Sequence, residues 1–195
     1  MLRRMGATAF PARPVLADRL PGTLARDVAL VVAAAGLTAL SAQIKIPVPF
    51  SPVPVTGQTF AVLLTGAALG PARGAAGQLL YVALGLLGLP FFAGGESGVD
   101  YFFGATGGYL LGFVAAAWFV GVCARRGLDR SPFGTLVAFA LGTLLIYSFG
   151  VPWLAVAADA PLGKAIDLGV VPFLIGDVLK AALAAAFLPA AWRFA

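Results

Sequence analysis

The chain has 195 residues, of which 61% are hydrophobic and only 11% are charged, and its mean hydropathy is +0.97. A soluble domain has about 25% charged residues, so the composition excludes an ordinary water-soluble enzyme. It also excludes a disordered chain, which would be poor in apolar residues. Histidine is absent and Cys123 is the single cysteine, which excludes His-based catalytic triads, disulfides and cysteine metal clusters. We therefore expect a membrane protein with no catalytic residues, no metal and no cofactor, and we interpret Cys123 as a small apolar side chain.

The first 25 residues are rich in arginine and proline. Arg3 and Arg4 resemble the start of a signal peptide, but several prolines and Asp18 interrupt the apolar core that a signal peptide needs. We predict a cytoplasmic tail over residues 1–25 and a membrane domain over residues 26–195.

Charged residues divide the rest of the chain into long uncharged stretches, each near the roughly 17–25 apolar residues that a membrane-spanning helix needs. Lipid leaves backbone groups without hydrogen-bond partners, so only helices or closed barrels cross it, and these stretches lack the alternation of barrel strands. The prediction is an all-α integral membrane protein with six transmembrane helices. The expected helices are 26–45, 55–70, 73–90, 106–125, 133–156 and 170–191.

The basic residues predict the orientation of these helices, because cytoplasmic loops carry the excess of Lys and Arg. With both termini cytoplasmic, ten of the 13 basic residues lie inside, and Lys45 and Lys164 lie outside. The segments 46–54, 91–105 and 157–169 are then the outer loops. The +5 net charge reports this orientation, and it is not evidence for nucleic-acid binding.

Apart from charges at the ends of the predicted spans, Asp177 and Lys180 are the two charges that lie within the membrane. Three residues apart, they share one face of the last helix, and charges at such depth face a cavity or a partner. One interpretation is a self-neutralising pair that locks helix packing. The other is the floor of an outward-facing pocket for a small amphoteric ligand, in which Asp177 accepts hydrogen bonds from ligand N–H groups and Lys180 donates to a carbonyl or carboxylate.

Two outer segments could cover such a pocket. The segment 46–58 is rich in proline and therefore stiff. The segment 90–108 mixes glycines with five aromatic residues, which either form an interfacial belt or contact an apolar ligand ring; Trp153 is ambiguous in the same way. The sequence lacks a P-loop, because Gly163-Lys164 is followed by alanine, so the chain is not its own ATPase.

Small residues recur at four-residue spacing on the first predicted helix. Ala25, Ala29 and Ala33 form one stripe, and Ala35 and Ala39 form another. Such stripes allow close helix–helix contact in lipid, either inside the bundle or with a second membrane protein.

Four ordered motifs resemble the BioY family, the biotin-binding S components of energy-coupling-factor (ECF) vitamin transporters. They are IPVPFSPVPVTGQTFAVLLTGAALG (46–70), GQLLYVALGLLGLPFFAGG (77–95), TGGYLLGF (106–113) and PFLIGDVLK (172–180). The resemblance covers roughly residues 28–190. One departure is Ala105, where the family usually has proline before Thr-Gly-Gly, which leaves the shape of that outer loop open.

The resemblance implies a protein of the bacterial cell (inner) membrane that captures biotin from outside. It also implies partners, namely one transmembrane T subunit and two ATPase subunits. Asp177 and Lys180 match the family's vitamin-contacting Asp and Lys, while Gln58, Thr106 and Tyr109 are secondary substrate-binding candidates. The alanine stripe matches a family docking face for the T subunit, which would include Ala29 and Ala33.

Three alternatives stay open at this point. Lys180 holds either the ureido carbonyl or the acid tail of biotin. A second alternative is that the chain serves another small vitamin instead of biotin. A third alternative is that the chain is a non-transporting membrane scaffold in which the buried pair is structural.

Overall fold

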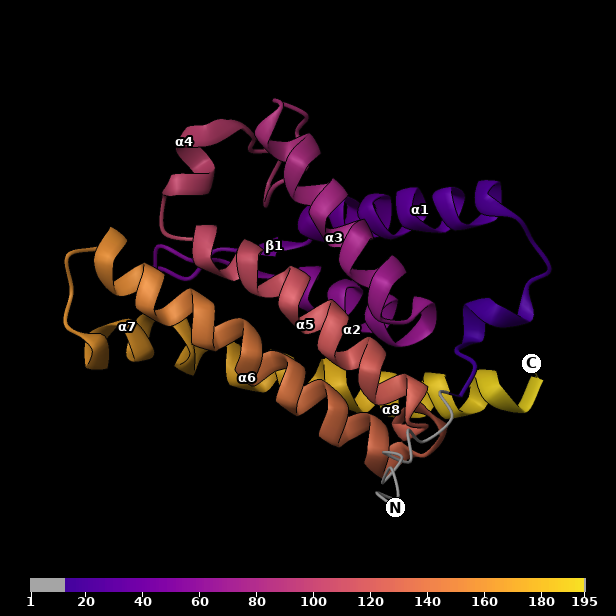
Figure 1. The fold of residues 1–195 in the computed structure, drawn as a ribbon. Coiled ribbons are helices and arrows are strands. Elements are labelled where there is room, and N and C mark those ends of the chain that lie inside the picture. The colour runs from indigo at the N-terminus through magenta and orange to yellow at the C-terminus, as the bar shows by residue number, and fades with distance from the viewer. Residues whose placement is uncertain (1–12, 195) are drawn as a thin grey trace, which may run out of the picture.

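A computed structural model describes residues 13–194, and helices dominate it (Figure 1). Each of the six predicted ranges is mainly helical, but the ends of several were wrong: Lys45 and Val55–Thr56 are strand, residues 87–90 lie beyond the last helical residue of the third range, and α-helix in the sixth range begins only at Leu174. The helices in these ranges are α1 (Leu24–Ala42), α2 (Gln58–Leu69), α3 (Pro71–Leu86), α5 (Gly107–Arg125), α6 (Pro132–Ala157) and α8 (Leu174–Phe194).

Within residues 13–194, four stretches are long and apolar enough to cross a membrane: α1, α5, α6 and the combined stretch Leu162–Phe194. These confirm an all-α membrane protein in coarse terms. Helix α2 has only 12 residues and α3 has 16. At about 1.5 Å per residue, both are shorter than the roughly 30 Å hydrocarbon core. Gly70, with φ +82°, and Pro71 divide this part of the chain into two short helices, because a proline at the first position starts a new helix.

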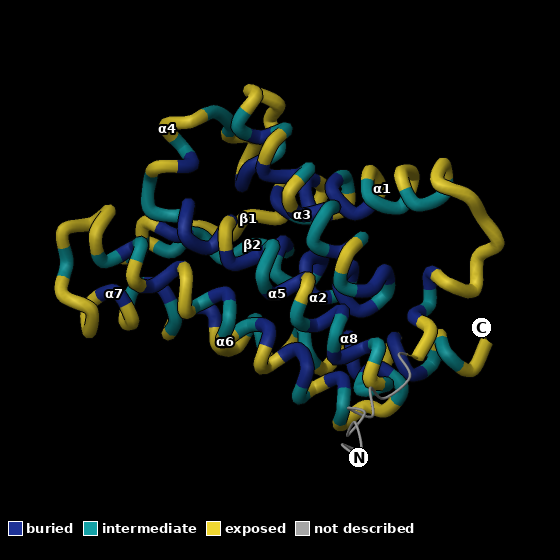
Figure 2. Tube along the Cα trace, in the orientation of Figure 1, coloured by how far each residue is buried: buried dark blue, intermediate teal, exposed yellow. Residues whose placement is uncertain are grey.

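Helix α5 lies at the centre of the bundle, and α1 and α8 lie at its periphery (Figure 2). Glycines bring the backbones together: a Cβ at Gly66 of α2 would lie 2.5 Å from the Ala117 carbonyl oxygen of α5, and one at Gly112 would lie 2.9 Å from the Ile146 Cα of α6. Small residues permit this close packing in lipid. The outer faces carry exposed apolar side chains such as Leu40 and Ile175, as expected of surfaces that face lipid.

The three predicted outer loops contain more regular structure than we expected. Strands β1 (Lys45–Ile46) and β2 (Val55–Thr56) form an antiparallel hairpin around the proline-rich segment. Helices α4 (Gly98–Phe103) and α7 (Leu162–Gly169) replace expected loops. The fold is therefore all-α apart from one minimal hairpin, which forms because the prolines hold that segment extended.

The N-terminal segment packs against one end of the bundle. It contains the short 3-10 helix η1 (Leu16–Arg19) and the fully buried Val15. The carboxylate of Asp18 pairs with Arg73 of α3 and lies 3.9 Å from Arg125 of α5. Arg3 and Arg4 lie outside the described residues, and the boundary at residue 25 stays a prediction.

Replacing Asp18 with asparagine is expected to loosen this segment by about 1 kcal/mol, as for a partly exposed ion pair. Burial raises the pKa of the Asp18 carboxyl, but hydrogen bonds from Arg73 and the Val15 amide outweigh burial and hold the pKa below its ordinary value of 3.8. A lowered folded-state pKa contributes stability that is present above the ordinary value and is lost as the pH falls through the lowered one.

Hydrogen–deuterium exchange of residues 13–20, corrected for intrinsic rates, measures the effect. At pH 7 we expect residues 13–20 to exchange faster in Asp18→Asn than in the unsubstituted protein. In the unsubstituted protein we expect faster exchange of these residues only at acid pH. Asp100→Asn on α4 is the control. Equal protection in the Asp18 variant at pH 7 would show that the ion pair does not hold the segment.

Candidate functional site

Helix α8 directs two of its three charged residues, Asp177 and Lys180, into the bundle, and the third, Arg193, is exposed in its last turn. The side chains of Asp177 and Lys180 are 12% and 18% exposed, and Lys180 Nζ lies 3.4 Å from Asp177 Oδ1. Ile175, Val178 and Leu179 on the same helix are largely exposed. This part of the helix thus presents its charges inward and its aliphatic residues to lipid.

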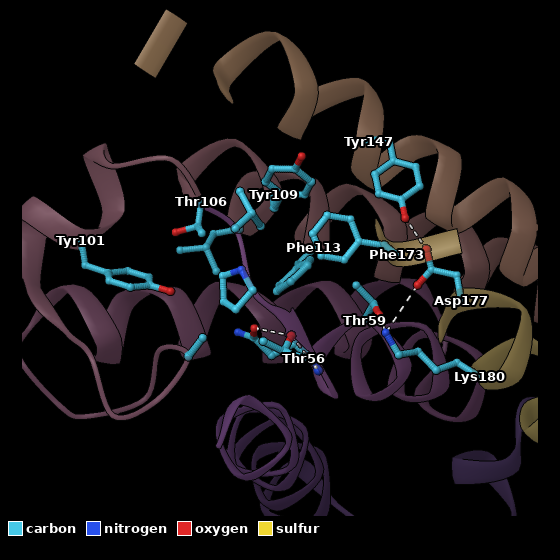
Figure 3. Close-up of a pocket in the computed structure, with 15 residues that line it drawn as sticks. Thr56, Thr59, Tyr101, Thr106, Tyr109, Phe113, Tyr147, Phe173, Asp177 and Lys180 are labelled. Atoms are coloured by element: carbon cyan, nitrogen blue, oxygen red, sulfur yellow. Dashed lines mark hydrogen bonds and ion pairs between the residues drawn. The ribbon is translucent and has the colours of Figure 1, made fainter. Parts of the chain in front are cut away.

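The ion pair has one further partner on each side, and each partner comes from another helix. Tyr147 of α6 donates its hydroxyl to Asp177 Oδ2, and Lys180 Nζ lies 2.7 Å from Thr59 Oγ1 of α2, to which it donates (Figure 3). Hydrogen bonds to charged groups contribute about 1.5–3 kcal/mol each. The result is a cluster of four polar side chains, which we call the polar floor: Thr59, Tyr147, Asp177 and Lys180.

A cavity lies against the polar floor and holds all five predicted substrate-binding residues in its lining. Figure 3 shows Tyr101 at one end and the ion pair at the other, with Phe113 and Phe173 between them. The full lining is Val53, Pro54, Thr56, Gln58, Thr59, Ala93, Tyr101, Thr106, Tyr109, Leu110, Phe113, Tyr147, Phe173, Asp177 and Lys180. Its charged end, apolar middle and aromatic far end suit an amphipathic ring ligand.

The cavity has a volume of about 50 Å³. Small-molecule pockets usually measure roughly 300–1,000 Å³. A ring-containing ligand therefore enters only when lining side chains move apart.

The secondary candidates contribute differently. Gln58 is 5% exposed and donates to the Tyr81 hydroxyl. It also accepts a hydrogen bond from Thr56 Oγ1 at 2.8 Å, so it orients the Thr56 side chain. Tyr109 donates its hydroxyl to the Gly169 carbonyl at 2.9 Å, which leaves its ring facing the cavity. Thr106 lies just before α5, at the outer part of the lining.

Sequence reasoning missed Thr59 and Tyr147. Thr59 directly follows Gln58, and Tyr147 is the single tyrosine of α6, a helix that also contains the hydroxyls of Thr135, Thr143 and Ser148. A hydroxyl in a span is a weak signal of a site, because hydroxyl side chains of Ser and Thr often bond within their own helix. Their pairing with α8 is visible only in the fold.

The aromatic residues of the segment 90–108 have two roles: some line the cavity, and others hold the segment in place. Tyr101 lines the cavity and stacks on Phe92 with ring centroids 5.1 Å apart. Phe102 and Phe103 pack on Trp153, whose indole N–H donates to the Gly104 carbonyl at 2.9 Å. Trp153 therefore anchors the loop to α6, an arrangement that the sequence had left ambiguous.

Among residues 13–194, no group of three or more His, Cys, Asp or Glu side chains could hold a metal ion. Cys123 is buried and unpaired within that range, consistent with its interpretation as an apolar side chain.

Comparison with known proteins decides the family. The model of the BioY family matches residues 11–195. The chain belongs to the BioY family. Similar family members include the probable biotin transporter BioY of Pyrococcus horikoshii, 40% identical over 160 residues that cover 82% of this chain and 92% of the relative. The biotin transporter BioY of Rhizobium etli is 35% identical, with 82% and 89% covered.

A solved structure agrees with the family assignment. A crystal structure described as the S-component for biotin from an ECF-type ABC transporter aligns with a TM-score of 0.75 and 25% identity. The alignment covers 89% of this chain and 95% of that one. The BioY fold therefore extends over nearly the whole chain.

Proposed function

We propose that this BioY-family chain captures biotin at the outer side of the membrane and passes it inward with an ECF energising module. The observation that carries the proposal is the polar floor beneath an apolar cavity, in a chain whose relatives are named biotin transporters. The chain acts as a transport subunit and not as an enzyme.

The chemistry of biotin fits the cavity in three parts. The Asp177 carboxylate accepts from the ureido N–H groups, and Lys180 donates to the ureido carbonyl. Phe113 and Phe173 pack on the apolar thiophane ring. Each buried polar group of the ligand thereby finds a partner, which the low dielectric of the bilayer requires.

The arrangement of the ends supports a six-span topology with both termini cytoplasmic. Figure 1 places α4 and α7 at one end of the bundle, with the segment around η1 and the end of α8 at the other. The η1 end carries Arg73 and Arg125, as the positive-inside rule requires of the cytoplasmic side. In this topology α2 and α3 span the membrane despite their length, and the membrane is the bacterial inner membrane.

The proposed partners are one transmembrane T subunit and two ATPase subunits. Ala25, Ala29 and Ala33 of α1 are exposed, whereas Ala35 and Ala39 are buried in the bundle. Ala33 also borders an apolar groove between α1 and α2, together with Leu30, Leu37 and Leu64. This face fits a close-packing helix of the T subunit.

Isothermal titration of the purified protein with biotin, riboflavin and thiamine tests the function. We expect heat from biotin alone. Binding of another vitamin instead would identify an S component of different specificity. A purified protein that binds none of the three would favour the scaffold alternative.

A further inference from the structure

A second, larger chamber adjoins the cavity on the side of α4. It has a volume of about 430 Å³ and shares Pro54, Tyr101 and Thr106 with the inner cavity. The remaining lining is Lys45, Pro47, Val48, Ser51, Pro52, Glu96, Gly104 and Ala105. The shared residues form a partition, so a ligand that enters from this side passes the outer chamber first.

Among the described residues that line the outer chamber, Lys45 is the one basic residue and Glu96 is the one acidic residue. Neither forms an ion pair within the described part of the chain. The hairpin pairs Lys45 with Thr56, which itself lines the inner cavity. The Lys45 side chain also lies along Gly94, where a Cβ would come within 2.9 Å of Nζ. The Lys45 side chain thus lines the outer chamber, and its ammonium group has no carboxylate partner among the described residues.

The charge balance of the polar floor determines which end of the ligand it accepts. Asp177 and Lys180 neutralise one another at 3.4 Å. A carboxylate placed beside them would leave one uncompensated negative charge at membrane depth, which costs several kcal/mol. The uncharged ureido group adds no charge there. The outer chamber, bordered by exposed residues such as Lys45 and Glu96, leaves a carboxylate partly hydrated.

We infer that the outer chamber receives the carboxylate tail of the ligand and that Lys45 gives the site its preference for an acidic tail. The inference rests on the proposed function. It assigns the ureido group to the polar floor and the thiophane ring to the apolar middle. The alkyl tail then passes the partition at Tyr101 and Thr106.

Titration with biotin and with biotin amide, whose tail is uncharged, tests the inference. We expect the unsubstituted protein to prefer biotin by about fivefold, the upper range for an exposed ion pair. Lys45→Gln should abolish this preference, because it should weaken the binding of biotin and leave the binding of biotin amide unchanged. Glu96→Gln, which removes a like charge, should strengthen biotin alone. The preference of the unsubstituted protein should shrink in 1 M salt, because exposed charges are screened.

Lys164→Gln is the matched control, because Lys164 is the other outer lysine and lies on α7, away from both linings. It should leave both affinities unchanged. Equal weakening of biotin and its amide in Lys45→Gln would assign Lys45 a structural role in the hairpin and overturn the inference. Binding of both compounds without preference would overturn it too and leave the biotin proposal intact. Binding of neither compound by the unsubstituted protein would instead refute the proposed function.

Discussion

Replacing Asp177 with asparagine is expected to weaken biotin binding by a factor of about 100, since about 3 kcal/mol corresponds to that factor. Asparagine keeps the shape of the side chain but removes its charge, and its amide group presents donors where the ligand's N–H groups need an acceptor. The loss equals one to two hydrogen bonds to a charged group. Isothermal titration measures the affinity, and Asp167→Asn on the exposed face of α7 is the control.

A double variant separates a binding site from a structural lock. Removing one partner leaves Lys180 uncompensated, so Asp177→Asn lowers stability under either explanation. The double variant Asp177→Asn with Lys180→Gln removes both charges. If the pair only locks α8, the double variant regains stability and binds biotin with the affinity of the unsubstituted protein. We expect it to regain stability but to remain unable to bind biotin. Retention of native affinity in the double variant would contradict our site assignment.

The candidate site was largely predictable because charges are so rare in this chain. Asp177 and Lys180 stand out in a long apolar stretch, and burial of a charge always needs an explanation. Tyr147 and Thr59 do not stand out, because hydroxyls are tolerated in spans when they bond to their own helix. They lie 30 and 121 residues from the charged residues that they contact, and no local pattern records such a pairing.

The helices were predictable for a different reason from the outer segments. Apolar length decides a span, so α1, α5 and α6 begin and end within three residues of the expected positions. The prolines and charged residues around the segment of α7 predict a loop there. Yet Leu162, Ala165, Ile166 and Gly169 have the spacing of one helical face. Eight residues were too few to weigh against the turn signals around them.

Replacing Ala29 and Ala33 together with leucine is expected to abolish uptake driven by the ECF module while biotin affinity changes less than about twofold. Both alanines are exposed on α1, outside the cavity lining. Close helix–helix packing in lipid depends on small residues, because dispersion contacts fade rapidly as backbones separate. Two leucine side chains would hold a partner helix off this face and so disconnect capture of the vitamin from its release.

Co-purification with the T subunit and uptake of labelled biotin measure this effect, and α8 supplies the matched control. Ala182 and Ala186 are also exposed and also four residues apart, so their replacement with leucine adds the same bulk to another lipid-facing helix. We expect the α8 variant to retain the complex and its uptake. Equal loss in both variants would point to general misfolding, whereas retention of the complex in the α1 variant would place the partner on a different face. Since Ala33 of α1 borders an apolar groove between α1 and α2, the outer surface of α1 is the one on which added bulk should separate binding from transport.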